Sequence, residues 1–454
     1  MPDSSSNLFA LLSRAQHQLD QGFADLPEAP TAPLGPAAAA ILNEAATRLH
    51  DNYPYGHPLY AGQMLKPPHP IARAAYALTM SINPNNHALD GGRASSAMEL
   101  ETVAELAKMF GFPQHLGHLS SSGTFANLEA LWVSGQTLPG RGIAASDQAH
   151  YTHTRISSVL GLPFTEIPSD RSGRMNMAAL EQALQSNNIG TVVATLGTTA
   201  VGAVDPLPQI LELQKKYNFR IHVDSAYGGY FTLANNLGPE ARAAYDLIPH
   251  ADSIVVDPHK HGLQPYGCGA VLFRDPTVGR FYKHDSPFTY FSSKELHLGE
   301  ISLECSRAGA SAVALWATQR LLPYTHTGEF AQNISTGREA AIEFNRRIAA
   351  DPRFLAPNAP PQLDIVFYAV RSKEQTLEAS STLAKRIFDE AARLDLHLAL
   401  ASLPVRFFPA QTFPGHTTGS VTCLRSVMMK PEHLAWIDRI WSRLDQATTT
   451  VLTI

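Results

Sequence analysis

Short apolar runs alternate with helical segments over residues 97–275, and this alternation limits the possible folds more than any other feature. Four runs are apolar or β-branched and end at turn-forming residues: "TVVATLG" (191–197), "FRIHVD" (219–224), "SIVVD" (253–257) and "GAVLFRD" (269–275). Such runs are typical of buried parallel strands. The segment "LPQILELQKKYN" has the apolar spacing of a crossover helix. The pattern predicts an α/β domain with a mostly parallel sheet, which binds ligands at the carboxyl ends of its strands.

The rest of the chain is expected to divide around this domain. Prolines interrupt "LPEAPTAPLGP" (26–36), and residues 55–96 are dense in Gly, Pro and Asn, which predicts a long ordered loop. Beyond about residue 325 the pattern changes to helix, strand, helix and strand, which indicates a smaller α+β domain. We therefore expect three parts: an N-terminal segment of helices and interface loops (1–80), a large domain (81–325) and a small C-terminal domain (326–454).

The charge balance argues against several classes of protein. The chain has 35 Lys and Arg residues against 40 Asp and Glu residues, a net charge of −5, and no basic run, so a nucleic-acid partner is not expected. No apolar run reaches the roughly 18 residues needed to span a bilayer, and the first residues lack the pattern of a secretory signal. The three widely spaced cysteines favour reduced thiols. We therefore expect a cytoplasmic protein without a membrane partner.

Two charged residues stand where predicted strands end. Lys260, in "DPHKHG", lies in a turn between two apolar runs. The ordinary interpretation is a surface lysine, but an amine partly removed from water there is suited to Schiff-base chemistry. Asp224 ends the run "IHVD", where it either caps a turn or faces a ligand at the edge of the sheet.

The stretch "SSSGTFANLEAL" (120–131) passes from a Ser/Gly/Thr loop into a helix. Free backbone N–H groups and the positive end of the helix dipole favour a phosphate there, although Ser and Thr are also ordinary helix caps. In "DQAHYTH", His150 is suited to stack on a flat ring, and His150 with His153 would alternatively ligate a metal or fill the core. No HExxH pattern accompanies them, so a metal-dependent hydrolase is the weaker alternative and no metal ligand is assigned.

Together these features supply a phosphate cradle, an amine, a buried carboxylate and a stacking imidazole, which are the groups that a pyridoxal phosphate site requires. Five blocks resemble, in order, the group II pyridoxal-phosphate-dependent amino acid decarboxylases: "SSSGTFANLEAL", "DQAHYTHTR", "ATLGTTAVGAVDPL", "HVDSAYGGY" and "DPHKHG". That family includes aromatic amino acid, tyrosine, glutamate and aspartate decarboxylases, and the "DPHK" version resembles its bacterial and archaeal branch. The likeness is clear over roughly residues 50–330. It implies pyridoxal 5'-phosphate, fold type I of the enzymes that use this cofactor, and a homodimer with the active site at the subunit interface.

The resemblance also implies roles for individual residues. Lys260 would form the internal aldimine with the cofactor, and Asp224 would pair with the pyridine nitrogen. His150 and Ala226 would pack on opposite faces of the ring. The other implied cofactor contacts are Ser122, Gly123, Thr124 and His259 at the phosphate, Thr199 near the ring hydroxyl, and Ser306 at the phosphate of the neighbouring subunit.

The implied reaction is decarboxylation of an L-amino acid to its amine through an external aldimine and a quinonoid. The expected substrate contacts are His57, Tyr60, His87 and Arg425, the last beside the substrate carboxylate. Tyr290 is the candidate for a loop tyrosine that protonates the carbanion, and without such a tyrosine the outcome would shift toward an aldehyde. An aminotransferase is a further alternative, because the sequence does not show which Cα bond is held perpendicular to the ring. His261 receives no role.

Overall fold

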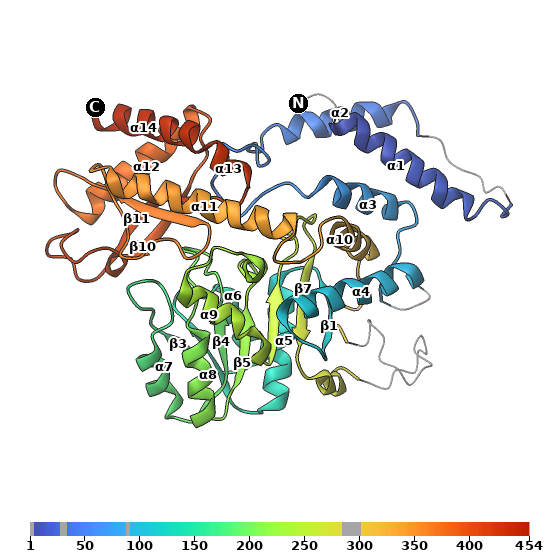
Figure 1. Cartoon of the computed structure of the whole chain (residues 1–454), viewed down its shortest axis with the longest axis horizontal. Coiled ribbons are helices and arrows are strands. Elements are labelled where there is room, and N and C mark those ends of the chain that lie inside the picture. Colours follow the sequence, from blue (N-terminus) through green and yellow to red (C-terminus); the bar gives the residue numbers. More distant parts are fainter. Residues whose placement is uncertain (1–3, 28–33, 88–90, 284–300, 454) are drawn as a thin grey trace.

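The structure, a computed structural model of the chain, describes residues 4–27, 34–87, 91–283 and 301–453. Figure 1 shows a sheet flanked by helices in the lower half of the view and a second sheet at the upper left. The first sheet is built from residues 116–273 and the second from residues 354–427. This architecture, a large mostly parallel sheet followed by a smaller C-terminal α+β unit, is the predicted fold class.

The large sheet has seven strands in the described part of the chain, in the order β1-β7-β6-β5-β4-β2-β3. Their bounds are β1 (Leu116–Ser120), β2 (Gly142–Ser146), β3 (Phe164–Ile167), β4 (Ile189–Thr195), β5 (Arg220–Asp224), β6 (Ser253–Val256) and β7 (Gly269–Phe273). Strands β2 to β6 pair in parallel, and of these β4, β5 and β6 were predicted from the sequence. Their carboxyl ends therefore meet at one edge of the sheet.

The prediction that "GAVLFRD" forms a parallel strand is wrong. It forms β7, which pairs antiparallel with β6 and with β1. Residues 257–268, which join β6 to β7, contain no helix. Because a parallel neighbour needs a long crossover, usually a helix, the chain instead turns back and runs antiparallel. This return connection holds Lys260.

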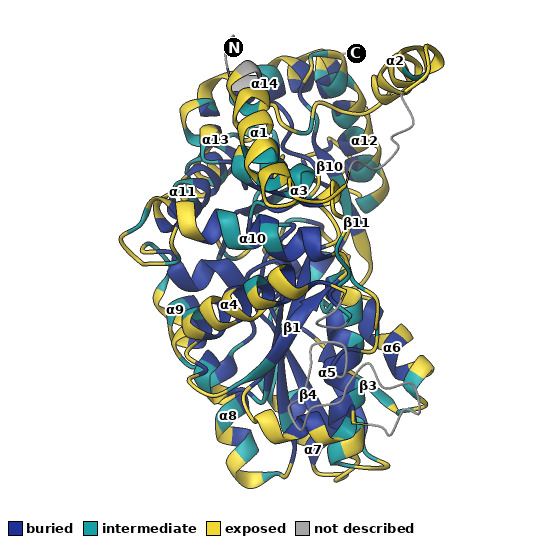
Figure 2. Ribbon diagram, turned by 90° about the vertical axis from the view of Figure 1, so that its right-hand side faces the viewer, coloured by how far each residue is buried: buried dark blue, intermediate teal, exposed yellow. Residues whose placement is uncertain are grey.

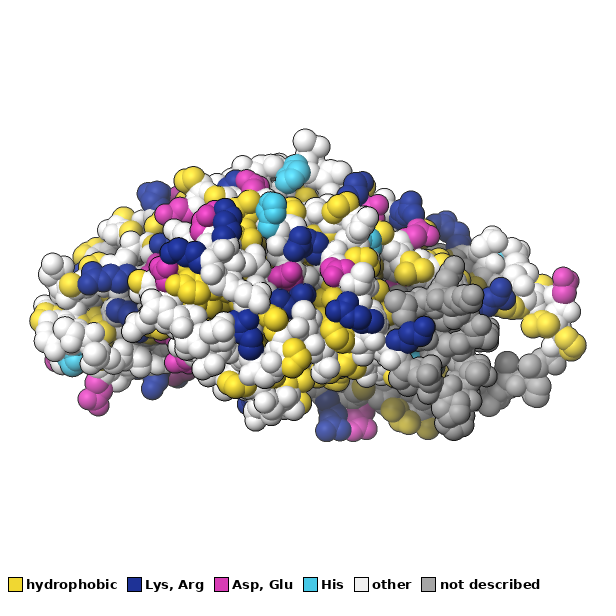
Figure 3. All heavy atoms as spheres, turned by 90° about the horizontal axis from the view of Figure 1, so that it is seen from below, with side chains coloured by type: hydrophobic (Ala, Val, Ile, Leu, Met, Phe, Trp, Pro, Cys, Tyr) yellow, Lys and Arg dark blue, Asp and Glu magenta, His cyan; other side chains and the backbone are white. Residues whose placement is uncertain are grey.

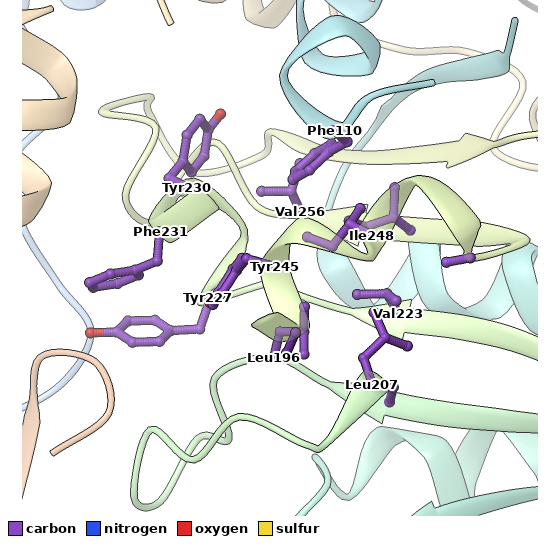
Figure 4. Close-up of a cluster of buried hydrophobic side chains, with 14 of the residues drawn as sticks. Phe110, Leu196, Leu207, Val223, Tyr227, Tyr230, Phe231, Tyr245, Ile248 and Val256 are labelled. Atoms are coloured by element: carbon purple, nitrogen blue, oxygen red, sulfur yellow. The ribbon is translucent and has the colours of Figure 1, made fainter. Parts of the chain in front are cut away.

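Helices cover both faces of the large sheet. They are α4 (Arg93–Phe110), α5 (Gly123–Thr137), α6 (Thr152–Leu160), α7 (Met177–Leu184), α8 (Leu207–Lys216), α9 (Pro239–Asp246) and α10 (Gly309–Leu321). Along β6, Ile254 and Val256 pack in the layer that contains α4, α7, α8 and α9, whereas Val255 packs in the layer that contains α5, as the two-residue period of a strand requires. Figure 4 shows part of the first layer, with Phe110 beside Val256.

The C-terminal part has its own antiparallel sheet, in the order β10-β11-β9-β8. Its strands are β8 (Phe354–Leu355), β9 (Ile365–Val370), β10 (Ala399–Pro404) and β11 (Ser420–Val427), and its helices are α11 (Glu329–Ala350), α12 (Leu377–Arg393), α13 (Glu432–Ala435) and α14 (Ile437–Thr453). Apolar residues of α11, α12 and α14 form a second core against this sheet.

The N-terminal part contributes α1 (Ser4–Gln21), α2 (Ala37–Leu49) and α3 (Pro70–Met80). The expectation of an uninterrupted loop over 55–96 is wrong because α3 lies within it. His69 accepts a hydrogen bond from the amide of Ile71, and Pro70 occupies the first helical position, where its missing N–H costs nothing. The proline that suggested a loop therefore starts a helix.

Two surface properties follow from these elements. Figure 2 shows α2 exposed and projecting from the body, and α2 has no buried residue. On the face seen from below in Figure 3, Lys and Arg side chains lie among Asp and Glu side chains, so this face carries charges of both signs.

Among the helices that the structure describes, none is long and apolar enough to cross a membrane.

Candidate active site

A cavity of about 670 Å³ lies at the carboxyl ends of β4 and β5, beside the turn that follows β6. The parallel strands and the return connection bring together residues that are far apart in sequence. All predicted cofactor residues except Ser306 line this cavity: Ser122, Gly123, Thr124, His150, Thr199, Asp224, Ala226, His259 and Lys260.

Lys260 faces a carboxylate that sequence reasoning missed. Its amine lies 3.0 Å from Oδ2 of Asp257, whose side chain is 4% exposed. The turn is fixed by backbone hydrogen bonds, from the amide of Lys260 to the carbonyl of Asp257 and from the amide of His259 to the carbonyl of Cys268. The three-residue spacing of Asp257 and Lys260 in a turn is the signal that would have revealed the pair.

The loop before α5 forms the expected cradle. Ser122 caps the helix, its hydroxyl oxygen accepting from the amide of Phe125 at 3.3 Å, and the amides of the next residues have no partner within the helix. Gly123 is packed so closely that a Cβ there would lie 2.7 Å from both carboxylate oxygens of Asp257. Glycine is therefore required where α5 approaches the Lys260 turn.

Asp224, the last residue of β5, is held by a histidine. Its Oδ2 lies 2.8 Å from Nε2 of His153, and its Oδ1 accepts from the amide of Ala226 at 3.1 Å. Burial alone would raise the pKa of Asp224, but the hydrogen bond and charge of His153 and the hydrogen bond of the Ala226 amide outweigh it and hold the pKa well below its usual range. Asp224 is therefore a buried anion at neutral pH.

His153 has a different role from the metal ligand considered from the sequence. It lies in the first turn of α6, pairs with Asp224 and is itself 1% exposed. Among the described residues there is no group of three or more His, Cys, Asp or Glu side chains arranged to hold a metal ion.

His150 presents an uncharged ring to the cavity. Burial lowers its pKa, only partly opposed by Asp224, so the imidazole is neutral at neutral pH. Its Nδ1 lies 2.9 Å from the hydroxyl of Thr152, which fixes the orientation of the ring. A neutral, oriented imidazole is suited to stack on a flat heterocycle.

Three buried polar atoms of the lining have no hydrogen-bond partner among the residues that the structure describes: Oδ1 of Asp257, Nδ1 of His259 and Oγ1 of Thr195. Buried polar atoms are normally paired, so these atoms fit a polar ligand. Pyridoxal 5'-phosphate carries an aldehyde, a ring nitrogen and a phosphate, which match the amine of Lys260, the carboxylate of Asp224 and the helix start at Gly123. The residues present therefore fit this cofactor.

Two predicted substrate residues, Arg425 and Tyr60, do not line the cavity. Arg425, 4% exposed, donates to the carbonyls of Thr199 at 2.6 Å and Ala200 at 2.9 Å, and Thr199 lines the cavity. Tyr60 is buried, and its ring packs against the ring of Tyr55 with centroids 5.1 Å apart.

The other predicted residues lie elsewhere on this subunit. His57 packs its ring on Trp436, and Nδ1 of His87 lies 3.1 Å from the thiol of Cys305. Ser306 is exposed and accepts from Asn85. Tyr290 lies outside the described residues. The roles expected for these four residues stay predictions.

Comparison with known proteins agrees with this geometry. Residues 134–370 match the model of the pyridoxal-dependent decarboxylase conserved domain. The L-tyrosine decarboxylase of Enterococcus faecium is 27% identical, over 78% of this chain and 76% of the relative. The probable L-tyrosine/L-aspartate decarboxylase of Methanothermobacter thermautotrophicus is 28% identical, over 57% of this chain and 70% of the relative.

Solved structures show the same fold. The structure of Oryza sativa TDC with PLP and tryptamine superposes with a TM-score of 0.78 at 17% identity, covering 99% of both chains. Mouse CSAD superposes with a TM-score of 0.78 at 21% identity, covering 96% of this chain and 91% of the other. The range of the family match contains His150, Asp224 and Lys260. The chain therefore belongs to the pyridoxal-dependent decarboxylase family and is an amino acid decarboxylase that uses pyridoxal 5'-phosphate as its cofactor.

Proposed function

We propose that the protein converts an L-amino acid into the corresponding amine and carbon dioxide, with Lys260, Asp224 and His150 as catalytic residues. The observation that carries this proposal is their meeting in one cavity, as an amine, a buried anion and a neutral imidazole, beside three unpartnered polar atoms. When bound, pyridoxal 5'-phosphate supplies an aldehyde that reacts with amines and a ring that accepts the electron pair left when a bond at Cα breaks.

Each catalytic residue has a task that its surroundings support. The amine of Lys260, held beside Asp257, would hold the cofactor through its aldehyde and would give way to the substrate amine. The anion of Asp224 would favour a proton on the ring nitrogen, and His153 fixes the carboxylate in position. His150 and Ala226, which both line the cavity, would hold the ring.

We propose that the substrate is an aromatic L-amino acid, and L-tyrosine is the first candidate. The guanidinium of Arg425 has five N–H donors and donates to the carbonyls of Gly62, Thr199 and Ala200, so donors are left for a substrate carboxylate. Next to it, Tyr60 forms an aromatic surface with the ring of Tyr53, their centroids 6.2 Å apart, which suits an aromatic side chain.

The products test the reaction and the substrate together. The purified holoenzyme, given L-tyrosine, is expected to release carbon dioxide and the amine in equal amounts, and L-aspartate is expected to react more slowly. Product analysis by mass spectrometry with carbon dioxide capture measures both. Release of ammonia with an aldehyde, or of a keto acid without carbon dioxide, would contradict the proposal, and a chelator is expected to leave the rate unchanged.

We further propose that the protein is a homodimer. In α2, Ile41, Leu42 and Leu49 are 63%, 68% and 65% exposed, and a projecting apolar helix of this kind is typical of an interface. A second copy would cover it and would bring Ser306, exposed here, toward a neighbouring active site. Sedimentation is expected to give the mass of a dimer, and deletion of residues 1–49 is expected to shift the protein toward monomer. A full-length protein that stays monomeric at micromolar concentration would contradict this.

The close packing at the start of α5 gives a prediction for cofactor affinity. Gly123→Ala is expected to weaken binding of pyridoxal 5'-phosphate by about tenfold, or ~1.4 kcal/mol, because the new Cβ displaces the carboxylate of Asp257 from Lys260. The matched control is Gly135→Ala in the same helix, where the Cβ meets only the flexible side chain of Leu162. Absorbance titration of the apoenzyme measures both affinities, and equal affinities would show that the contact does not matter.

A further inference from the structure

A second cavity, of about 870 Å³, lies between residues 56–70, the first turns of α11 and residues 430–432. It shares no lining residue with the catalytic cavity. The proposed function uses none of its side chains.

Two lysine amines line this cavity with donors to spare. The side chain of Lys430 is almost completely buried, and its amine donates to the carbonyl of Tyr60 at 2.7 Å. The amine of Lys66 donates to the carbonyl of Met429 at 3.3 Å. An ammonium has three donors, so each amine has donors left, and the nearby charges of Asp364 and Glu432 favour the charged form of Lys66. Burial lowers the pKa of Lys430 to about 7 and that of Lys66 to about 8.

A histidine lines the same cavity. His261 is 1% exposed, and no residue in the described part of the chain hydrogen-bonds to its Nδ1. Its Nε2 lies 3.2 Å from Oδ2 of Asp364. A buried ring nitrogen left unpaired beside a cavity is expected to have a partner there.

The rim has the opposite charge. Glu329 and Glu432 line the cavity and are exposed to solvent. The two glutamates would repel a dianion such as phosphate. A single negative charge placed between the two amines reduces the repulsion between the amines and offsets the free-energy cost of burying them. The arrangement favours a singly charged anion, and an attached ammonium group would be attracted to the rim.

We propose that this cavity is a second binding site, which takes the carboxylate of a small molecule between Lys66 and Lys430, beside His261. The carboxylate comes either from a simple organic acid or from an amino acid, whose ammonium group would face Glu329 and Glu432. The proposal goes beyond decarboxylation and does not depend on the role of Lys260.

The second site is linked to the catalytic cavity. Oδ1 of Asp364 accepts a hydrogen bond of 2.5 Å from the hydroxyl of Tyr227, while its Oδ2 lies beside His261. Tyr227 lines the catalytic cavity and His261 the second one. Figure 4 shows the Tyr227 ring at the edge of the apolar cluster, its hydroxyl pointing away from Leu196. A ligand that binds at His261 is therefore connected, through Asp364 and Tyr227, to the part of the catalytic cavity next to Ala226.

Ligand-observed NMR on the full-length holoenzyme tests the site with three probes: acetate, D-alanine and ethylamine. Acetate and D-alanine are expected to bind, and ethylamine, which lacks a carboxylate, is not. Lys66→Met and Lys430→Met are each expected to weaken binding at least tenfold. The control Lys215→Met, at an exposed position on α8, is expected to leave binding unchanged. Thermal unfolding of each variant identifies any that fails to fold, and either lysine variant alone suffices for the test.

A further variant separates the second site from the catalytic one. Lys260→Ala is expected to retain binding of acetate, so failure of the proposed catalytic role leaves this test intact. If the natural ligand is an amino acid, Glu432→Gln is expected to weaken the binding of D-alanine and to leave the binding of acetate unchanged. If it is a simple acid, the variant is expected to weaken the binding of neither probe. Both results support a carboxylate site. Binding that is absent in the wild type, unchanged in both lysine variants, or lost with Lys260→Ala would overturn the proposal.

Discussion

Lys260→Ala is expected to lower kcat by a factor on the order of 10³ or more, the scale seen when a covalent catalytic group is removed. Without the amine, the cofactor aldehyde is no longer held covalently at the mouth of the sheet, and the substrate has to react with it directly. Lys260→Arg is the matched control, because it keeps a positive charge beside Asp257 but forms no such bond. Both variants are expected to lose activity to a similar extent.

Borohydride reduction followed by peptide mass spectrometry locates the covalent bond. The wild-type holoenzyme is expected to carry the reduced cofactor on the peptide that contains Lys260, and both variants are expected to carry none. Turnover within tenfold of the wild type, or a label on another lysine, would show that the catalytic amine lies elsewhere.

Asp224→Asn is expected to lower kcat by about 10²–10³, the usual effect of removing one preorganised electrostatic partner. A neutral amide no longer favours a proton on the ring nitrogen, so the ring accepts electrons less readily. The absorbance spectrum of the bound cofactor and the steady-state rate measure this change. Unchanged kcat would mean that the carboxylate has only a structural role.

His153→Phe tests the same carboxylate through pH. His153 holds the pKa of Asp224 well below its usual range, so without it the carboxyl group takes up a proton at a higher pH. In a plot of kcat against pH, the acid limb is therefore expected to shift to higher pH. The depressed pKa also means that Asp224 stabilises the fold above the pKa of the unfolded carboxyl and that this contribution is lost as the pH falls. Identical profiles for variant and wild type would contradict the role of His153.

The sequence was sufficient to predict the α/β fold and most of the cofactor residues that line the catalytic cavity. Lys260, Asp224 and Gly123 follow apolar runs or precede a helix, and in a parallel sheet such positions converge at one edge. The partners of these residues were missed. Asp257 lies three residues before Lys260 in the same turn, a local signal that was not used. His153 contacts Asp224 only because the start of α6 packs beside the end of β5, and no local pattern indicates that contact.

Other elements and positions that were not predicted from the sequence were missed for similar reasons. The strand "GIAAS" of β2 (Gly142–Ser146) has small residues with little strand preference, and only burial on both faces makes it a strand. The positions of His57 and His87 depend on how long connections pack against distant helices. His261 has no role in the sequence-based prediction, and it lines a cavity that forms only where α11 and residues 430–432 pack together.

The return connection between β6 and β7 has a consequence for the order in which the molecule opens. Each of these strands is hydrogen-bonded to a neighbour on both sides, so the turn that holds Lys260 is anchored to two interior strands of the sheet. Local unfolding begins where few buried contacts are made, and it reaches central strands only with global unfolding. Amides of β6 and β7 are expected to exchange with solvent deuterium among the slowest in the chain, and α2, which has no buried residue, among the fastest. The cofactor attachment point would then survive every partial opening of the native state.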